Sequence, residues 1–368
     1  HRRTEGQRMI VFRNDRSGPF THAPNSVGDT MRMVMLALTP ATLLDVWLFG
    51  WPAVYLFIVT VGSCILIEMG CLKLQGKTTR ATLLDGSAAL TGWLLAMSLP
   101  PWAPWWIGVL GAIFAIALAK HLFGGLGQNV FNPAMVARVA LLISFPVPMT
   151  AFVPPRPLFS AGAPGLLDSL AITFGHGFHL DTMSAASALG TIKTELSRGI
   201  PVSQSIEATP DIWHMLIGAR PGSFGETSAI LILLGGVWLI RKHVIGWRIP
   251  VAVMGTLFVF GTLFHGLDPE RFTSGLFQVV SGATFLGAFF IATDYVTSPV
   301  SKSGQMAFGI GVGLFTWIIR SFAGYPEGMA FAVLLMNAVT PLIDRAFKPR
   351  TFGRTRSGAP LPLPRRAK

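Results

Sequence analysis

The chain has 368 residues, of which 51% are hydrophobic and only 12% are charged. Soluble domains carry roughly 25% charged residues, so this composition argues against a soluble protein and indicates one that crosses a membrane several times. The net charge of +12 is then expected in cytoplasmic loops rather than in a nucleic-acid-binding surface, and two cysteines are too few to hold a zinc ion or an iron–sulfur cluster alone.

Ten stretches are apolar and long enough to predict spanning helices, each of which needs about 20 residues. The fold class expected from them is an all-α polytopic membrane protein. Most connections between the stretches are short, but a polar insert containing Gly and Pro separates the fifth from the sixth. In chain order the ten predicted spans cover approximately residues 31–50, 53–72, 82–99, 103–121, 131–149, 227–240, 248–266, 275–293, 305–321 and 328–344.

The lysines and arginines predict an orientation. If the N-terminus lies inside, most of the 29 basic side chains fall in cytoplasmic segments, and the majority of the others fall in the long insert, where this rule is weak. Both termini are therefore expected to be cytoplasmic and the insert extracytoplasmic. The predicted regions are a cytoplasmic segment 1–30, a first five-helix half 31–149, the insert 150–224, a second five-helix half 225–344 and a basic cytoplasmic tail 345–368.

Two pairs of similar segments indicate an internal repeat. "DGSAALTGWLLAMSLPP" at 85–101 resembles "SGATFLGAFFIATDYVTSP" at 281–299, and the segment entering the fifth span resembles the one entering the tenth. Because each half has an odd number of spans, the two halves would be inverted relative to one another. Inverted repeats usually place a binding site where the halves meet, near the membrane midplane.

The sequence SGAT, at Ser281 to Thr284, matches a signal that flavin transferases recognise when they attach FMN to a hydroxyl group. It lies in the predicted span 275–293, and the small residues Ser87 to Ala89 occupy the equivalent place in the third span. Small residues allow helices to approach closely, so we interpret this SGAT as helix packing rather than as an attachment site.

Acidic residues in or beside spans are candidates for an ion or proton path, because a carboxylate in a bilayer is costly unless it faces water, a partner or an ion. Asp85 begins the third predicted span, Asp294 ends the eighth and Asp344 ends the tenth. Interfacial snorkelling or helix capping is the alternative for these three, and for Asp344 so is a pair with Arg345. For Asp45 and Glu68, within the first two spans, we favour interfacial or capping positions.

The loop "FGGLGQNVFNPA" at 123–134 combines three glycines, which permit unusual backbone angles, with two asparagines. Asn132 followed by Pro133 is a good start for a helix, since proline suits the first helical position. The amides of Asn129 and Asn132 offer paired donors and acceptors, which suit the imide edge of a flat heterocycle such as an isoalloxazine. A capping and turn segment is the other interpretation of this loop.

Several of these segments together resemble one family. They are "SLPPWAPWW" at 98–106, "FGGLGQNVFNPAM" at 123–135, "LLISFPVPMT" at 141–150, "SGATFLGAFFIATD" at 281–294 and "IRSFAGYPEGMAFAVLLMNAVTPLID" at 319–344. From about Ile10 to Gly353 the chain is similar to the D subunit of the Rnf electron-transport complex, a relative of the B subunit of the sodium-pumping NADH:quinone oxidoreductase.

The resemblance implies ten spans in two inverted five-helix halves, a fold similar to that of urea transporters, in the bacterial cytoplasmic (inner) membrane. It also implies a subunit, not catalytic alone, of a complex that couples ferredoxin/NAD electron transfer to Na⁺ or H⁺ translocation. The expected partners are other subunits of that complex, including an FMN-bearing subunit and iron–sulfur subunits, and a flavin transferase for maturation.

The resemblance further implies two flavins. Covalent FMN is expected on a hydroxyl of the insert in a Ser-x-Ala-Thr pattern, which here is Ser184 to Ser187, so that Ser187 stands where the family has Thr and Thr191 is the nearest backup. Non-covalent riboflavin is expected at Asn129 and Asn132. A change in flavin charge is expected to act on carboxylates such as Asp294 and so link electron transfer to ion movement.

Two other functions are compatible with the sequence. Ten spans in inverted repeats would equally serve a solute transporter or channel of urea-transporter-like fold with no redox role. A structural scaffold whose flavin sites are vestigial is the third alternative, because Ser187 departs from the family's pattern.

Overall fold

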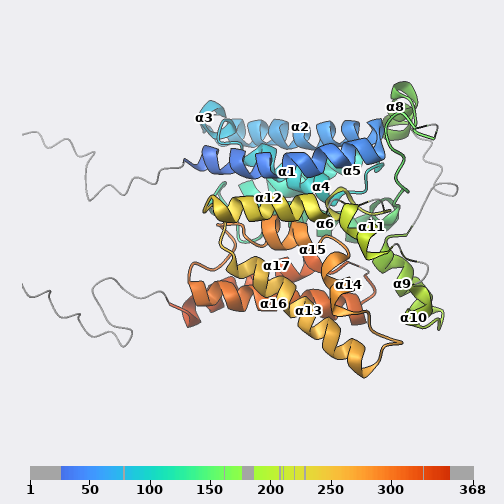
Figure 1. Ribbon diagram of the computed structural model, residues 1–368. Helices are drawn as coiled ribbons and strands as arrows, with labels where there is room; N and C mark the ends of the chain where they lie inside the picture. The colour runs from blue at the N-terminus through green and yellow to red at the C-terminus, as the bar shows by residue number, and fades with distance from the viewer. Residues whose placement is uncertain are drawn as a thin grey trace, which may run out of the picture.

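The computed structural model describes residues 26–348, apart from residues 78, 161, 176–185, 207–208, 210, 219, 228 and 326. The predicted basic tail from 349 onward and most of the segment 1–30 lie outside this range. Within it, the long helices run side by side, as Figure 1 shows. α1 (Val27–Phe49) begins and α17 (Met329–Ala346) ends at one end of the bundle, and the helices of the insert gather at the opposite end. These helices are α8 (Leu166–Phe174), α9 (Ala188–Ser197), α10 (Val202–Ser205) and α11 (Ile212–Ile217).

Five helices in the described part of the chain are long and apolar enough to cross a membrane, and they make this a multi-pass membrane protein. They match the first, second, seventh, ninth and tenth predicted spans. Besides α1 and α17 they are α2 (Trp51–Leu74), α13 (Arg248–Leu267) and α16 (Lys302–Phe322).

The other predicted spans are shorter or interrupted. Residues of the third span divide between α3 (Thr79–Leu83) and α4 (Ser87–Ser98), and α4 ends just before a pair of prolines that cannot continue a helix. The fourth is α5 (Trp105–Ala112), which widens into the π-helix η1 (Ile113–His121), and the fifth is α6 (Pro133–Ser144) followed by the short α7 (Pro146–Thr150). The sixth follows the short η3 (Phe224–Glu226) as α12 (Ala229–Arg241).

The eighth span was predicted as one helix over 275–293, and this was wrong. It consists of α14 (Gly275–Val280), α15 (Thr284–Leu286) and the π-helix η4 (Gly287–Ile291), with a break inside SGAT. Gly282 has φ +63°, a left-handed conformation that favours glycine, and a Cβ at this position would collide with Glu327. Arg320 donates to the Gln278 carbonyl (2.7 Å) and to the Thr284 hydroxyl (3.0 Å), so the break is filled by protein groups.

Thr284 is fully buried, and its hydroxyl donates to the Ser281 carbonyl at 2.8 Å. SGAT was interpreted as packing within a helix; the motif instead breaks the helix, and its Thr284 hydroxyl is buried among protein groups.

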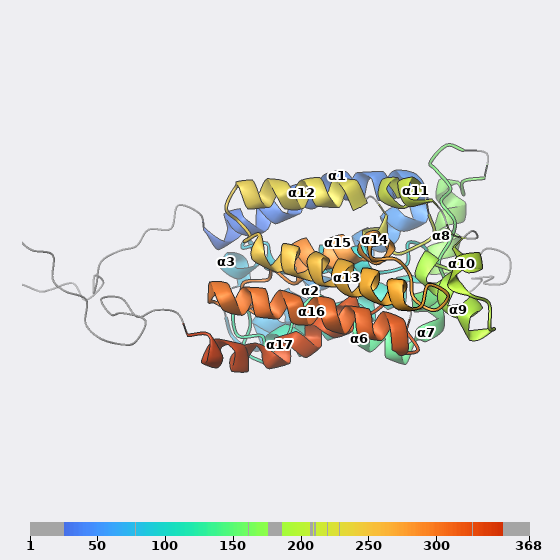
Figure 2. The ribbon, with the colours of Figure 1, turned by 60° about the horizontal axis from the view of Figure 1, so that its bottom comes forward.

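The described helices before the insert (the first half) pack against those after it (the second half): α1 contacts α12, and α6 contacts α17. Within the halves, α2 contacts α4 and α5, while α13 contacts α14 and α16. Figure 2 shows α1 beside α12 along the length of the bundle. One continuous apolar core includes residues from both halves, and a smaller one lies under the insert.

Candidate functional site

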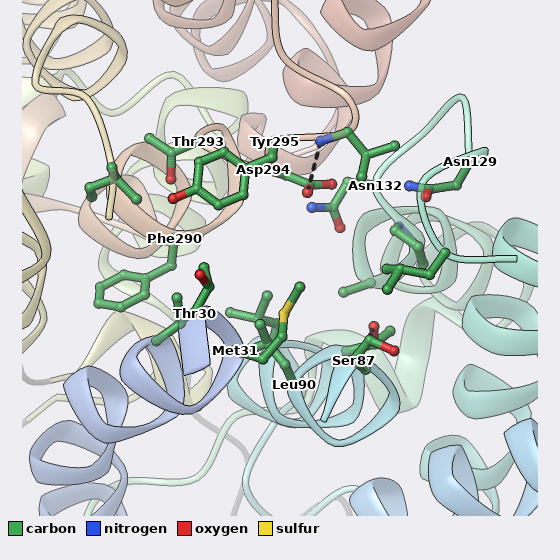
Figure 3. A pocket seen from close by; sticks show the side chains of 18 of the residues that line it. Thr30, Met31, Ser87, Leu90, Asn129, Asn132, Phe290, Thr293, Asp294 and Tyr295 are labelled. Carbon is green, nitrogen blue, oxygen red and sulfur yellow. Dashed lines mark hydrogen bonds between the residues drawn. The ribbon is translucent and has the colours of Figure 1, made fainter. Parts of the chain in front are cut away.

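A pocket opens between the two halves, near the end of the bundle where α1 begins. The space free of protein atoms there, including open solvent at its mouth, is about 870 Å³. α1, α4 and the loop before α6 supply one side, while α12, η4 and the turn after η4 supply the other. In Figure 3, Thr30, Met31, Leu90 and Ser87 lie across the pocket from Thr293, Asp294 and Tyr295.

Both predicted asparagines line this pocket and are buried. Asn132 caps α6 as the sequence predicted: its Oδ1 accepts from the Met135 amide (3.2 Å), and Pro133 is the first helical residue. Asn129 donates to the Phe131 carbonyl at 3.1 Å. The three glycines of the loop, at 124, 125 and 127, have positive φ, which allows the loop to fold back so that both amides reach the pocket.

Asn132 also joins the two halves of the protein. Its backbone amide donates to Asn337 Oδ1 on α17 (3.1 Å), and its own Nδ2 donates to the Ile291 carbonyl at the end of η4 (3.4 Å). Asn337 in turn donates to the Thr297 carbonyl at 3.2 Å. Sequence reasoning missed Asn337, although an amide within the apolar tenth span was a detectable signal.

Asp294 lines the same pocket from the second half. Its Oδ1 accepts from the Val296 amide (3.3 Å) and its Oδ2 accepts from the Thr297 hydroxyl (3.2 Å), so the carboxylate closes the turn that follows η4. Figure 3 shows the side chain beside Asn132. The structure thus brings the predicted pair Asn129 and Asn132 together with Asp294, which was predicted separately as an ion-path candidate.

A buried ion pair backs the pocket on the side of the first half. Lys120, at the end of η1, lines the pocket and lies 2.9–3.0 Å from the two carboxylate oxygens of Glu68. Lys120 also donates to the Ser87 hydroxyl at 2.8 Å, and the Nε2 of His121 lies 3.2 Å from Glu68. The expectation that Glu68 occupies an interfacial position was wrong, since it is 1% exposed and paired across two helices.

The remaining predicted acids lie outside the pocket lining. Asp85 Oδ1 accepts from the Ser87 amide (2.7 Å), which places this carboxylate directly before α4 as a cap and next to the pocket wall. Asp344 accepts from the Val300 amide at 3.1 Å. Asp45, expected at an interface, is instead fully buried, and the Thr227 hydroxyl donates to its Oδ1.

The chemistry of the pocket fits a flat, largely apolar ring system with one polar edge. Leu90, Leu94, Phe289 and Phe290 supply apolar walls. The amides of Asn129 and Asn132 can each make further hydrogen bonds, because an amide has two N–H donors and two acceptor lone pairs. Together with the carboxylate of Asp294, they provide both donors and acceptors for an edge that alternates carbonyl and N–H groups.

The predicted FMN acceptor, Ser187, lies at the opposite end of the bundle from the pocket. It caps α9, and its Oγ accepts from the Gly190 amide at 3.2 Å. The hydroxyl of Thr191 donates to the Ser187 carbonyl (3.2 Å). Ser187 is only 8% exposed; Ser184 and Ala185 lie outside the described residues. The hydroxyl that FMN would esterify is thus buried and bonded to the first turn of α9 in this structure.

A profile of the NQR2, RnfD, RnfE family matches residues 14–353 of this chain. A protein from Halorhodospira halophila, named as the D subunit of an ion-translocating oxidoreductase complex, is 51% identical over 94% of this chain and 97% of its own length. Proteins of the same name from Stutzerimonas stutzeri and Rhodobacter capsulatus are 51% and 48% identical, over 92% and 82% of this chain and 95% and 84% of their own lengths. Because the profile and these relatives cover most of the chain, it belongs to the NQR2, RnfD, RnfE family.

Proposed function

We propose that this chain is the flavin-bearing membrane subunit of an electron-transport complex that couples ferredoxin/NAD electron transfer to Na⁺ or H⁺ translocation. The relatives are named as subunits of an ion-translocating oxidoreductase complex. The single observation that carries the flavin part of the proposal is the pocket between the halves, where Asn129, Asn132 and Asp294 converge. The expected partners are iron–sulfur and FMN-bearing subunits and, for maturation, a flavin transferase.

The proposed membrane arrangement is ten spans in two inverted halves in the bacterial inner membrane. The matching contacts of α1 with α12, of α6 with α17, and of α2 and α13 with their neighbours support two related halves. The start of α1 and the end of α17 lie at one end of the bundle, and the insert lies at the other, which supports cytoplasmic termini and an extracytoplasmic insert.

Riboflavin is the proposed ligand of the pocket. When bound, it would accept and pass on electrons. Asn129 and Asn132 would bind its polar ring edge, and Leu90, Phe289 and Phe290 would exclude water from the ring faces. Asp294 would respond to a change of charge in the pocket, because an electrostatic interaction is strong where water is excluded. This response is the proposed link between electron transfer and ion movement.

The proposal for the pocket is tested with the intact complex. Asn129→Ala should lower the amount of riboflavin that co-purifies with the complex by about tenfold, since one buried hydrogen bond to a ligand contributes roughly 1–2 kcal/mol. Gln128→Ala, an exposed neighbour in the same loop, is the matched control and should retain riboflavin. Riboflavin is extracted and quantified by chromatography. Full riboflavin content in Asn129→Ala would contradict the site.

Covalent FMN is proposed on Ser187, with its phosphate at the N-terminus of α9. Three variants separate attachment from helix capping. Ser187→Thr keeps both a hydroxyl and a cap, Ser187→Asp keeps a cap but no acceptor, and Thr284→Ala removes the hydroxyl of SGAT. Flavin fluorescence of the chain on a denaturing gel, with the flavin transferase present, should persist in Ser187→Thr and Thr284→Ala but vanish in Ser187→Asp. Fluorescence in Ser187→Asp would shift the assignment to Thr191, and its loss only in Thr284→Ala would overturn the proposed orientation.

The rival function is a solute transporter, and the observation that favours it is the same pocket between two halves. The complex reconstituted in vesicles separates the two functions. A redox subunit should retain flavin and show no solute flux, whereas a purified chain without flavin that carries solute would support the transporter.

A further inference from the structure

Two charged side chains appear among the described residues that line the pocket, and they come from different halves. Lys120 belongs to the first half and Asp294 to the second. The partner of Lys120, Glu68, does not line the pocket but lies behind Lys120 on α2. The ion pair therefore presents its positive member to the pocket and keeps its negative member farther away.

Lys120 can affect a ligand in the pocket in two ways: through its hydrogen bond to Ser87 and through its own positive charge. Its three ammonium hydrogens are directed to the two oxygens of Glu68 and to the Ser87 hydroxyl, at 2.8–3.0 Å. Ser87 itself lines the pocket. Because its oxygen accepts a hydrogen bond from an ammonium group, the hydroxyl of Ser87 can donate its hydrogen to a ligand in the pocket, and the ammonium group makes it a stronger donor.

We infer that Lys120 is a positioning residue that stabilises the reduced form of the pocket's ligand over the oxidised form, and that Glu68 limits this preference. The inference rests on the proposed riboflavin site. Reduction of an isoalloxazine adds one net negative charge to the ring when it takes up two electrons and one proton. The electrons would come one at a time from an external donor such as a reduced iron–sulfur cluster, and the proton would come from solvent. Lys120 and the hydroxyl of Ser87, acting as a donor, would stabilise that negative charge in a pocket that holds little water.

Removing the charge of Glu68 alone and removing both charges of the pair should have opposite effects on the preference for the reduced ligand. Glu68→Gln leaves the Lys120 charge uncompensated, so the preference for reduced ligand should rise. The double variant Glu68→Gln with Lys120→Gln removes both charges, so the preference should fall below that of the unaltered protein. Lys120→Arg keeps a cation opposite Glu68 and should stay close to the unaltered protein. A purely structural role for the pair would not shift the preference in two directions.

The experiment uses the intact purified complex, washed free of riboflavin and then titrated at one fixed pH. Dissociation constants are measured for oxidised riboflavin and for riboflavin reduced with dithionite, and their ratio is compared between variants. The ratio should change about tenfold in the double variant, which corresponds to about 30 mV for a two-electron couple. Lys73→Gln is the matched control, because Lys73 is an exposed cation on the same helix as Glu68, and it should leave the ratio unchanged.

The outcomes distinguish this inference from the proposed function. If the unaltered complex does not rebind riboflavin, the riboflavin site and the inference both fail. If riboflavin binds but the ratio is the same in Glu68→Gln and in the double variant, the role of Lys120 is overturned and the site stands. Should the double variant not assemble, Glu68→Gln and Lys120→Arg still decide: an unchanged or lower preference in Glu68→Gln contradicts the inference.

Discussion

At the scale of single residues, the pair formed by Arg320 and Glu327 holds the break in the eighth span together. Glu327 lies in the connection between α16 and α17, 2.9 Å from Arg320, and it accepts from the Ala283 and Met329 amides. Burial works to raise the pKa of Glu327, but Arg320 and these hydrogen bonds outweigh it, so the pKa lies below its ordinary value of 4.5.

A carboxylate whose pKa is lower in the folded state adds stability that is present above its unfolded pKa and is lost as the pH falls through the folded value. Glu327→Gln should therefore lower the melting temperature of the complex at pH 7 by several degrees, and the deficit should shrink below about pH 4.5. Thermal melts in detergent at several pH values measure this difference. Glu270→Gln, an exposed acid, should show no such pH-dependent gap. A deficit that does not change with pH would contradict the assignment of the charge to Glu327.

At the scale of elements, the sequence predicts that a helix forms more readily than it predicts where that helix is interrupted. The first and second spans could be predicted because an unbroken apolar run is a local property of the sequence. The break at Gly282 could not, because it depends on Arg320 and Glu327, about 40 residues later in the chain. The cap at Asn132 was predictable, since a polar residue before a proline starts a helix by local chemistry.

One contact anchors the insert helix α9 to the membrane helices. Lys193 donates to the carbonyls of Ile319 (3.3 Å) and Arg320 (3.1 Å) at the end of α16 and to the carbonyl of Tyr325 (2.9 Å) in the connection that follows. Burial lowers the pKa of Lys193, but these three carbonyls satisfy its ammonium hydrogens. Lys193→Met should loosen α9, and hydrogen exchange of residues 188–197 should quicken about tenfold. Arg198→Met, at an exposed neighbouring position, is the control; unchanged exchange in Lys193→Met would show that apolar packing alone holds α9.

At the scale of the whole molecule, the candidate site depends on contacts between the halves. The loop with Asn129 and Asn132 could be singled out because glycine and amide chemistry is local, and Asp294 could be singled out because an acid beside a span is costly. The sequence did not indicate three site residues, Lys120, Glu68 and Asn337, because their roles depend on partners far away in the chain. The sequence around Glu68 does not reveal its partner, because Lys120 lies 52 residues later in the chain.

The position of Asp294 leads to a prediction about coupling. It faces the pocket from the second half, while Asn129, Asn132 and Lys120 face it from the first, so a change of charge in the pocket reaches this carboxylate across the boundary between the halves.

Asp294→Asn keeps the size of the side chain and an acceptor for the Val296 amide but removes the charge. In vesicles containing the complex, the number of ions moved per electron, measured at matched electron flux and per bound riboflavin, should fall about tenfold. Asp268→Asn, an exposed acid at the far end of α13, should leave this ratio unchanged. If Asp294→Asn pumps ions at the normal ratio, the charge of Asp294 does not link the two processes, and Asp85 and Asp344 remain as the candidate carboxylates.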